Sequence, residues 1–208
     1  MQSYLFKNIQ VVNEGKIIRS DVLTHGERIE KIDGQINVAR RITEINGENL
    51  HLFPGVIDDQ VHFREPGLTH KADIFSESRA AVAGGVTSFM EMPNTIPNAL
   101  TLDLLEDKYN IAAHSSLANY SFYMGVSNNN TDEVLRASKF KKSICGIKIF
   151  MGSSTGNMLV DNHATLNRIF AESDMLIATH CEDERIIRNN YEQLKASKNE
   201  LMPADHPL

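Results

Sequence analysis

Hydrophobic and polar positions follow different patterns in two parts of the chain. Before residue 53, short apolar stretches are separated by turn-forming residues, which is typical of a small antiparallel sheet. After residue 53, short apolar runs alternate with segments whose apolar positions recur every three to four residues, as in an amphipathic helix. The pattern therefore predicts a small N-terminal β-sheet domain, residues 1–52, with strands at 4–12, 16–18 and 28–32, and a second domain, residues 53–208.

The second part reads as a strand followed by a helix five times in succession. Such alternation is typical of a parallel sheet covered by helices, and the apolar strands indicate burial on both faces. Thr101 is the expected N-cap of the second helix. The expected strands are 56–63, 86–92, 120–126, 144–151 and 175–180, and the expected helices are 71–83, 102–115, 131–138, 163–172 and 182–196.

The predicted fold class is α/β, a partial (β/α)8 TIM-type barrel of about five strand–helix units behind a small N-terminal β-sheet. A complete barrel takes about 250 residues and this part offers about 150, so about three units are missing. Residues 203–208 end without a helix cap or a polar tail. We therefore expect a truncated chain, with an open five-stranded sheet as the structural alternative.

Composition excludes several classes of function. The 208 residues are 41% hydrophobic and 23% charged, as in an ordinary globular protein. The net charge of −6 argues against a nucleic-acid or membrane partner, and no apolar run is long enough for a membrane span. The chain start lacks the pattern of a secretory signal. Cys145 and Cys181 fit no disulfide framework and no metal spacing, so we expect both to be reduced, buried side chains in a cytoplasmic protein.

An unusual polar pattern occupies residues 52–67, which read L-F-P-G-V-I-D-D-Q-V-H-F-R-E-P-G. Side chains alternate along a strand, so one face is expected to carry four polar residues, namely Asp58, Gln60, His62 and Arg64. A site at the end of a buried strand needs such a face. The alternative is an edge strand whose polar face is solvated.

Polar residues also follow two of the other expected strands. The second strand ends in Glu91-Met92-Pro93-Asn94-Thr95, and the fifth ends in Thr179-His180-Cys181-Glu182-Asp183. A single histidine at a strand end is more often structural than a ligand. Because the carboxyl ends of the strands converge in a barrel, polar residues at several of these ends together indicate a site.

Lys148 lies inside an apolar run, residues 146–150. Burying an ammonium group is costly, so its pKa should fall toward neutrality. A neutral amine can react with carbon dioxide to give a carbamate, an anionic group able to bridge two metal ions. The alternative is a lysine that snorkels to the polar loop 152–157.

These motifs resemble those of dihydroorotases, in the amidohydrolase superfamily. Residues 54–67 are similar to the family's metal-binding opening, and the later segments Met92-Pro93-Asn94-Thr95, Gly146-Ile147-Lys148 and Thr179-His180-Cys181-Glu182 are similar to its other motifs. The resemblance implies that zinc binds to His62, carbamylated Lys148 and His180, with Lys148 as the catalytic residue. It also implies that Arg64 and Asn94 bind the substrate carboxylate.

The resemblance implies a function as well. A dihydroorotase reversibly cyclises N-carbamoyl-L-aspartate to L-dihydroorotate in pyrimidine biosynthesis, using water activated by one or two zinc ions at a cyclic amide. The expected partner is this small-molecule substrate, and a homodimer is compatible with the resemblance. Each motif alone is shared with hydantoinases and allantoinases, so a cyclic amidase of that type is one alternative. Arg64 argues against it, because a hydantoin core has no carboxylate to pair with.

Two features depart from the family pattern. Gln60 stands where the family usually has a histidine, and an amide oxygen is a much poorer zinc ligand than an imidazole nitrogen. One of the two metal ions is therefore expected to bind weakly, unless water or a carboxylate such as that of Asp58 replaces the missing histidine ligand. The family's later histidine ligand and aspartate base have no counterpart in these 208 residues. We expect the chain alone to be inactive, and a catalytically inactive scaffold is the second alternative.

Overall fold

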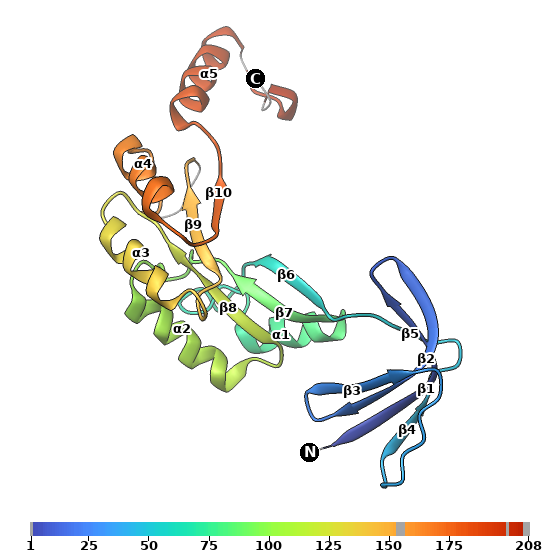
Figure 1. The fold of residues 1–208 in the computed structure, drawn as a ribbon. Coiled ribbons are helices and arrows are strands. Elements are labelled where there is room, and N and C mark those ends of the chain that lie inside the picture. Colours follow the sequence, from blue (N-terminus) through green and yellow to red (C-terminus); the bar gives the residue numbers. More distant parts are fainter. Residues whose placement is uncertain (1, 153–156, 199, 206–208) are drawn as a thin grey trace. The chain divides into compact units, whose positions relative to one another are not determined.

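The chain forms two units, Met1–Gly55 and Val56–Leu208. A computed structural model describes residues 2–152, 157–198 and 200–205 (Figure 1). Each unit contains a five-stranded sheet of its own. No helix in this described part is long and apolar enough to cross a membrane.

The first unit is built on a long β-hairpin. Its turn places Glu14 and Gly15 at φ values of 49° and 73°, the left-handed pair that suits the twist of a two-residue hairpin loop. The sheet order is β3-β2-β1-β4, and β5 also pairs with β1. The strands are β1 (Ser3–Asn13), β2 (Lys16–His25), β3 (Arg28–Asp33), β4 (Thr43–Asn46) and β5 (His51–Leu52).

The prediction of an antiparallel sheet is wrong for part of this unit. The pairs β1–β2 and β2–β3 are antiparallel, but β4 and β5 both run parallel to β1. These two strands have four and two residues, which is too short for an alternating pattern to reveal them in the sequence. The buried side chains of Leu5, Leu23 and Ile36 form the unit's small core.

The second unit is a parallel sheet in the order β10-β9-β8-β7-β6. It curls into half of a TIM-type barrel, which confirms the predicted fold class and the five strand–helix units. The strands are β6 (Val56–Val61), β7 (Val86–Glu91), β8 (Asn119–Gly125), β9 (Gly146–Phe150) and β10 (Ile177–His180). The helices are α1 (Ile74–Ala83), α2 (Leu102–Ser115), α3 (Thr131–Ala137), α4 (His163–Glu172) and α5 (Glu184–Ser197), with short 3-10 turns at Ser138–Phe140 and Pro203–Asp205.

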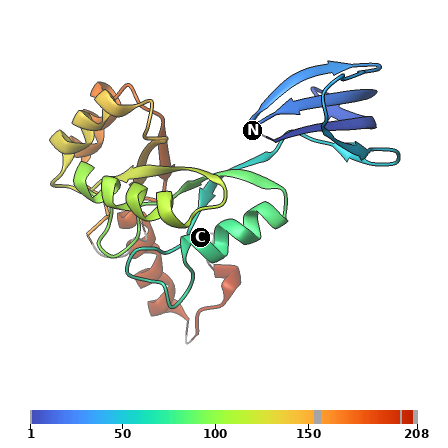
Figure 2. The same cartoon turned by 90° about the horizontal axis from the view of Figure 1, so that it is seen from below.

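The core of this unit lies between the sheet and helices α1 to α4, which follow one another along one side of it (Figures 1 and 2). Strand residues such as Phe89, Phe122 and Ile147 are fully buried there against Leu105 and Ile169 of the helices. Burying a side chain of this size contributes about 1.5–3 kcal/mol. The parallel sheet is therefore held mainly by its helix-facing side.

Side-chain caps start α1 and α2, and α1 begins at Ile74 rather than at the predicted residue 71. The Thr101 hydroxyl accepts a hydrogen bond from the Leu104 amide at 3.2 Å, which confirms Thr101 as the N-cap of α2. Asp73 caps α1 in the same way, and its carboxylate accepts from the Ser76 amide at 2.7 Å. Each cap satisfies one amide that the first helical turn leaves without a partner.

Strand β6 ends earlier than predicted. It stops at Val61 rather than at residue 63, and its register against β7 is irregular on both sides of Asp58. Arg64 then takes a left-handed conformation with φ 70°, so the expected alternation does not run through to Arg64. Gly67 follows with φ 85°, where an added Cβ would lie 2.1 Å from the Ile96 carbonyl oxygen. The second Pro-Gly turn therefore needs glycine for this close approach.

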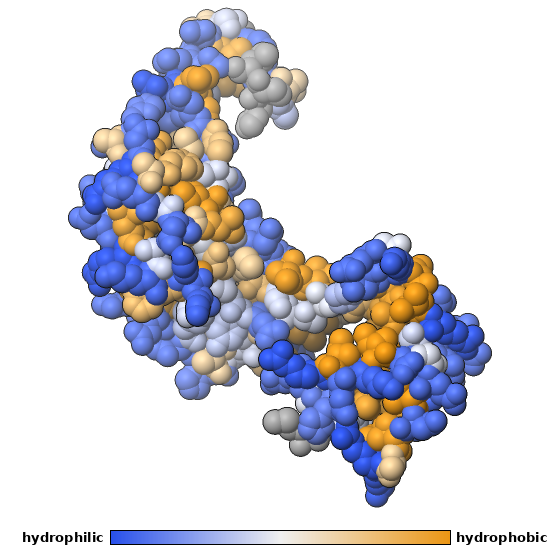
Figure 3. All heavy atoms as spheres, in the orientation of Figure 1, coloured by the Kyte–Doolittle hydropathy of each residue, from blue (hydrophilic) through white to orange (hydrophobic). Residues whose placement is uncertain are grey.

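Both outer strands of the second sheet have an open edge in the described residues, since β6 pairs with β7 and β10 pairs with β9. Apolar side chains are exposed beside these edges, with Ile57 and Leu176 each 62% accessible. Figure 3 shows further apolar patches on the surface. Helix α5 has no buried residue, although Ile186 and Tyr191 lie on it. Unpaired strand edges and exposed apolar side chains of this kind favour pairing with further strands.

Candidate metal and substrate site

Four of the five predicted site residues lie at or just after the carboxyl ends of three strands in the second unit, and the fifth, Lys148, lies in the middle of a fourth strand. His62 and Arg64 follow β6, and Asn94 follows β7. Lys148 lies within β9, and His180 is the last residue of β10. Because all these strands run parallel, their carboxyl ends share one edge of the sheet.

A hydrogen bond joins the first two strand ends. Nδ1 of His62 lies 2.9 Å from Oδ1 of Asn94. Because an amide oxygen can only accept, Nδ1 carries the proton and donates it, which leaves Nε2 with a free lone pair. This is the arrangement in which a histidine can bind a metal through Nε2.

Burial and three nearby basic residues determine the pKa of His62. Burial lowers the pKa of His62, and the hydrogen bond to Asn94 partly opposes this. The positive charges of Arg64, Lys148 and His180 lower the same pKa further. The imidazole is thus held in the neutral form that a metal requires.

Lys148 is buried, with 1% of its surface accessible. Its Nζ lies 5.0 Å from the centre of the Phe150 ring and makes no hydrogen bond or ion pair with any described residue. Burial lowers the pKa of Lys148, as the sequence predicts, and Cys181 partly offsets the effect. The snorkelling alternative concerns a loop whose residues 153–156 lie outside the described part.

His180 lies one strand away from Lys148. In the register of β9 and β10, Ala178 pairs with Lys148 and His180 pairs with Phe150. The rings of Phe150 and His180 meet edge to face, with their centres 5.3 Å apart. Phe150 therefore contacts both the Lys148 ammonium and the His180 imidazole.

Gln60 and Asp58 contact each other. Gln60 is exposed, and its backbone amide donates to Oδ1 of Asp58 at 3.2 Å. In the described part of the chain, no three His, Cys, Asp or Glu side chains are grouped so that they could hold a metal ion. A metal at this edge therefore requires a further donor, and carbamylated Lys148 with His62 and His180 would provide it.

A buried ion pair that the local sequence pattern did not predict lies beneath this edge. Nζ of Lys108, on α2, lies 2.5 Å from Oε2 of Glu91, the last residue of β7, and each side chain is 1% accessible. This contact is a charge pair outside hydrogen-bond geometry. Burial raises the pKa of Glu91 and lowers that of Lys108, and each partner opposes the shift of the other. The available signal was a lysine on the apolar stripe of a helix, between Leu105 and Ala112.

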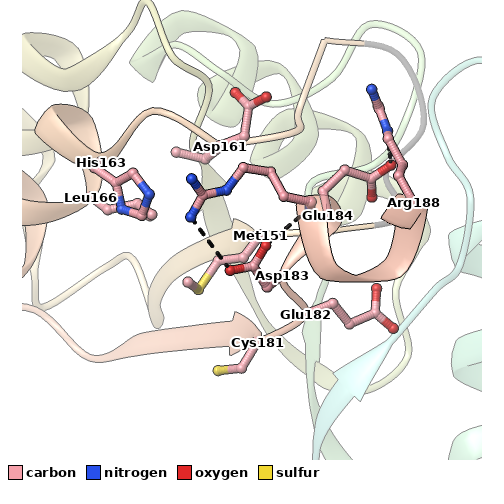
Figure 4. A pocket seen from close by; sticks show the side chains of 11 residues that line it. Met151, Asp161, His163, Leu166, Cys181, Glu182, Asp183, Glu184 and Arg188 are labelled. Atoms are coloured by element: carbon pink, nitrogen blue, oxygen red, sulfur yellow. Dashed lines mark hydrogen bonds and ion pairs between the residues drawn. The ribbon is translucent and has the colours of Figure 1, made fainter. Parts of the chain in front are cut away.

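A pocket beside the end of β10 is separate from these residues (Figure 4). Two of its acidic side chains are paired with arginines, Glu184 with Arg188 at 2.7 Å and Asp183 with Arg185 at 3.8 Å. None of the predicted metal or substrate residues lines it. The pocket therefore adds no ligand to the candidate site.

The expectation that both cysteines are buried is wrong for Cys181, which is exposed, and Cys145 is only partly buried. Cys181 follows the last residue of β10, beyond the packed part of the sheet. Both cysteines are free thiols.

Iodoacetamide at pH 8 is expected to modify Cys181 quickly and Cys145 very slowly. Burial raises the pKa of Cys145 to about 11, so its thiol stays protonated, and the thiolate is the reactive form. Peptide mass spectrometry after timed labelling measures the two rates. Unfolding in urea is the control, because both cysteines should then react, and equal rates in the folded protein would contradict the expectation.

Comparison with known proteins gives relatives of three kinds. The dihydroorotase of Halobacterium salinarum is 35% identical over 182 residues, which are 83% of this chain and 40% of the relative. The allantoinase of Deinococcus radiodurans is 32% identical over 184 residues, 86% of this chain and 40% of the relative. The solved L-hydantoinase (dihydropyrimidinase) of Arthrobacter aurescens has a TM-score of 0.88 and 26% identity, covering 99% of this chain and 46% of its own. No protein-family model matches the chain.

The chain spans about 40% of the length of the curated relatives named above. The similarity covers most of the chain, and the likeness to the solved L-hydantoinase includes the curled parallel sheet. It confirms the resemblance that the sequence motifs indicate. The chain is dihydroorotase-like over most of its length.

Proposed function

We propose that these residues form the metal and substrate edge of a zinc-dependent dihydroorotase. The reaction is the reversible cyclisation of N-carbamoyl-L-aspartate to L-dihydroorotate. One observation carries the proposal: the buried Lys148, which has no charged partner among the described residues, lies in the same parallel sheet that carries the neutral, oriented imidazole of His62, and its charge acts on that imidazole. An ammonium buried in an apolar strand is costly, which favours the neutral amine that carbamylation requires.

The donor chemistry of three residues supports the proposed zinc ion. His62 offers Nε2, His180 offers an imidazole from the neighbouring strand end, and Lys148 offers a carbamate after reaction with carbon dioxide. Zinc accepts such nitrogen and oxygen donors. When bound, it supplies Lewis acidity and activates water near neutral pH. Gln60 is exposed, and its amide oxygen is a poor zinc ligand. We therefore expect the site to hold one zinc ion firmly and a second ion weakly or not at all.

Arg64 and Asn94 are the proposed carboxylate binders. A guanidinium donates two parallel hydrogen bonds to a carboxylate, which fixes the orientation of the substrate as well as its charge. The Oδ1 atom of Asn94 is engaged by His62, so its amide nitrogen is the group left to donate. The hydrogen bond between His62 and Asn94 thus links the proposed metal ligand to the proposed substrate group.

The principal competing function is a hydantoinase-type or allantoinase-type cyclic amidase. The chain is similar to an allantoinase and to a solved L-hydantoinase, and both similarities support this alternative. Arg64 favours dihydroorotase, because it needs a substrate carboxylate. Gln60 favours an inactive scaffold, because an amide oxygen is a poor zinc ligand.

Substrate preference of the zinc-loaded full-length protein tests the proposal. We expect turnover of L-dihydroorotate to exceed that of hydantoin by roughly 30-fold or more, since a charge-assisted pair contributes on the order of 2–4 kcal/mol. A metal chelator should abolish both activities. A preference for hydantoin or allantoin would favour the cyclic amidase, and zinc binding without turnover of any of them would favour the scaffold.

The 208-residue chain by itself is expected to show no dihydroorotate turnover and weak zinc binding. The three proposed zinc ligands come from three strands, and the outermost two, β6 and β10, have open edges within the described residues. A catalytic metal site needs its ligands in fixed geometry. An activity assay of the purified chain, with and without added zinc, measures this. Turnover above the zinc-free blank would contradict the expectation.

A further inference from the structure

The buried ion pair of Glu91 and Lys108 has no role in the proposed chemistry. It lies between the sheet and α2, where the Lys108 ammonium is also 4.9 Å from the centre of the Phe122 ring. Two opposite charges in a core cost desolvation energy, and apolar residues of similar volume are often at least as stabilising. The pair therefore calls for an explanation other than stability.

Glu91 holds the backbone that carries Arg64. Its Oε1 atom accepts a hydrogen bond from the Arg64 amide at 3.1 Å. Arg64 has φ 70°, a left-handed conformation that a residue with a side chain adopts only when its surroundings hold it there. The buried carboxylate thus fixes the backbone from which the guanidinium extends.

Lys108 holds the backbone next to Asn94. Its Nζ atom donates to the Met92 carbonyl at 3.1 Å, two residues before Asn94. Asn94 in turn accepts the hydrogen bond from His62. One ion pair therefore contacts both segments that carry the proposed carboxylate binders.

We infer that Glu91 and Lys108 are positioning residues that set Arg64 and Asn94 at the spacing required by a substrate carboxylate. This inference rests on the proposed function. Lys108 holds the charge of Glu91 in place, and Glu91 provides the acceptor that keeps Arg64 in its left-handed conformation. Misplacing a binding group by about 1 Å can cost on the order of 100-fold in rate.

Two neutral double variants separate positioning from stability. Single variants leave an uncompensated charge in the core, which is strongly destabilising, whereas both doubles remove the two charges together. Glu91→Gln/Lys108→Met keeps an oxygen that can accept from the Arg64 amide. Glu91→Leu/Lys108→Met removes that acceptor. Tyr109→Phe is the control on the same helix, since its hydroxyl contacts Ser121 at 2.9 Å, away from Arg64.

The variants are made in the full-length protein. For Glu91→Leu/Lys108→Met we expect the KM for dihydroorotate to rise about 10- to 100-fold, with zinc content unchanged. The Arg64 amide, followed by residue-resolved hydrogen exchange, should exchange at least about 10-fold faster, because it loses its acceptor. Glu91→Gln/Lys108→Met keeps the acceptor for the Arg64 amide but loses the hydrogen bond from Lys108 to the Met92 carbonyl, so its Arg64 amide should exchange within a few-fold of the unsubstituted protein and its KM should rise less than that of Glu91→Leu/Lys108→Met. Tyr109→Phe should stay within a few-fold of the unsubstituted protein in both measurements.

Equal KM values in the two double variants, or loss of zinc in both, would overturn the inference. If the unsubstituted protein does not use dihydroorotate, the proposed function fails by itself. Hydrogen exchange then decides the positioning role, because it needs no substrate. Equal exchange of the Arg64 amide in the two double variants would overturn that role as well.

Discussion

Replacing Lys148 with alanine in the full-length protein is expected to remove bound zinc and to lower kcat/KM for dihydroorotate by more than about 1000-fold. The metal contributes several kcal/mol to transition-state stabilisation, and each 1.4 kcal/mol is a factor of ten. Lys148 is the buried member of the proposed ligand set and lies on the strand next to His180. Metal analysis of the purified variant, together with steady-state kinetics, measures the effect.

Short carboxylates provide a second test of Lys148. Added formate or acetate should restore part of the zinc and part of the activity, because either anion can fill the space of the missing carbamate. Lys142→Ala is the matched control, since Lys142 is exposed and precedes the same strand. Full zinc occupancy in Lys148→Ala would show that the lysine is structural, and the proposed metal site would then be wrong.

Replacing Arg64 with alanine is expected to lower kcat/KM for dihydroorotate by roughly 30- to 1000-fold while zinc content stays unchanged. Removing half of a charge-assisted bidentate pair costs on the order of 2–4 kcal/mol. Arg64 follows β6 at the edge that carries His62, and its charge acts on the His62 imidazole. The loss should therefore fall on substrate use and leave metal binding intact.

A substrate without a carboxylate and a lysine substitution sharpen this test. Turnover of hydantoin, if present, should change little in Arg64→Ala, because hydantoin offers no partner for the guanidinium. Arg64→Lys should be intermediate, since it keeps the charge and loses the planar fork. Equal use of dihydroorotate by Arg64→Ala and the unsubstituted protein would reject the carboxylate role.

The spacing of apolar residues along the chain was enough to predict the strands and helices of the second unit. Five strand–helix units, the cap at Thr101 and the lowered pKa of Lys148 all follow from local pattern and from burial of a charged group in an apolar run. These features depend on residues close together in the sequence. Local pattern therefore predicts which elements form and which strand ends carry polar residues.

Features that depend on distant partners could not be predicted in this way. The parallel pairing of β4 with β1 and the ion pair of Glu91 with Lys108 each join segments that no local pattern relates. The turn at Arg64 likewise depends on the carboxylate of Glu91, 27 positions further along the chain. The sequence thus indicated the proposed metal ligands, but not the buried contacts that hold their neighbours in position.

Anomalous diffraction at the zinc edge, from crystals of the zinc-loaded full-length protein, tests the central claim most directly. The account predicts a zinc peak about 2.0–2.2 Å from Nε2 of His62, from an imidazole nitrogen of His180 and from an oxygen on a carbamylated Lys148. Extra density on Nζ of Lys148 should accompany the peak. A zinc peak elsewhere, or an unmodified Lys148 beside zinc held by other residues, would contradict the account.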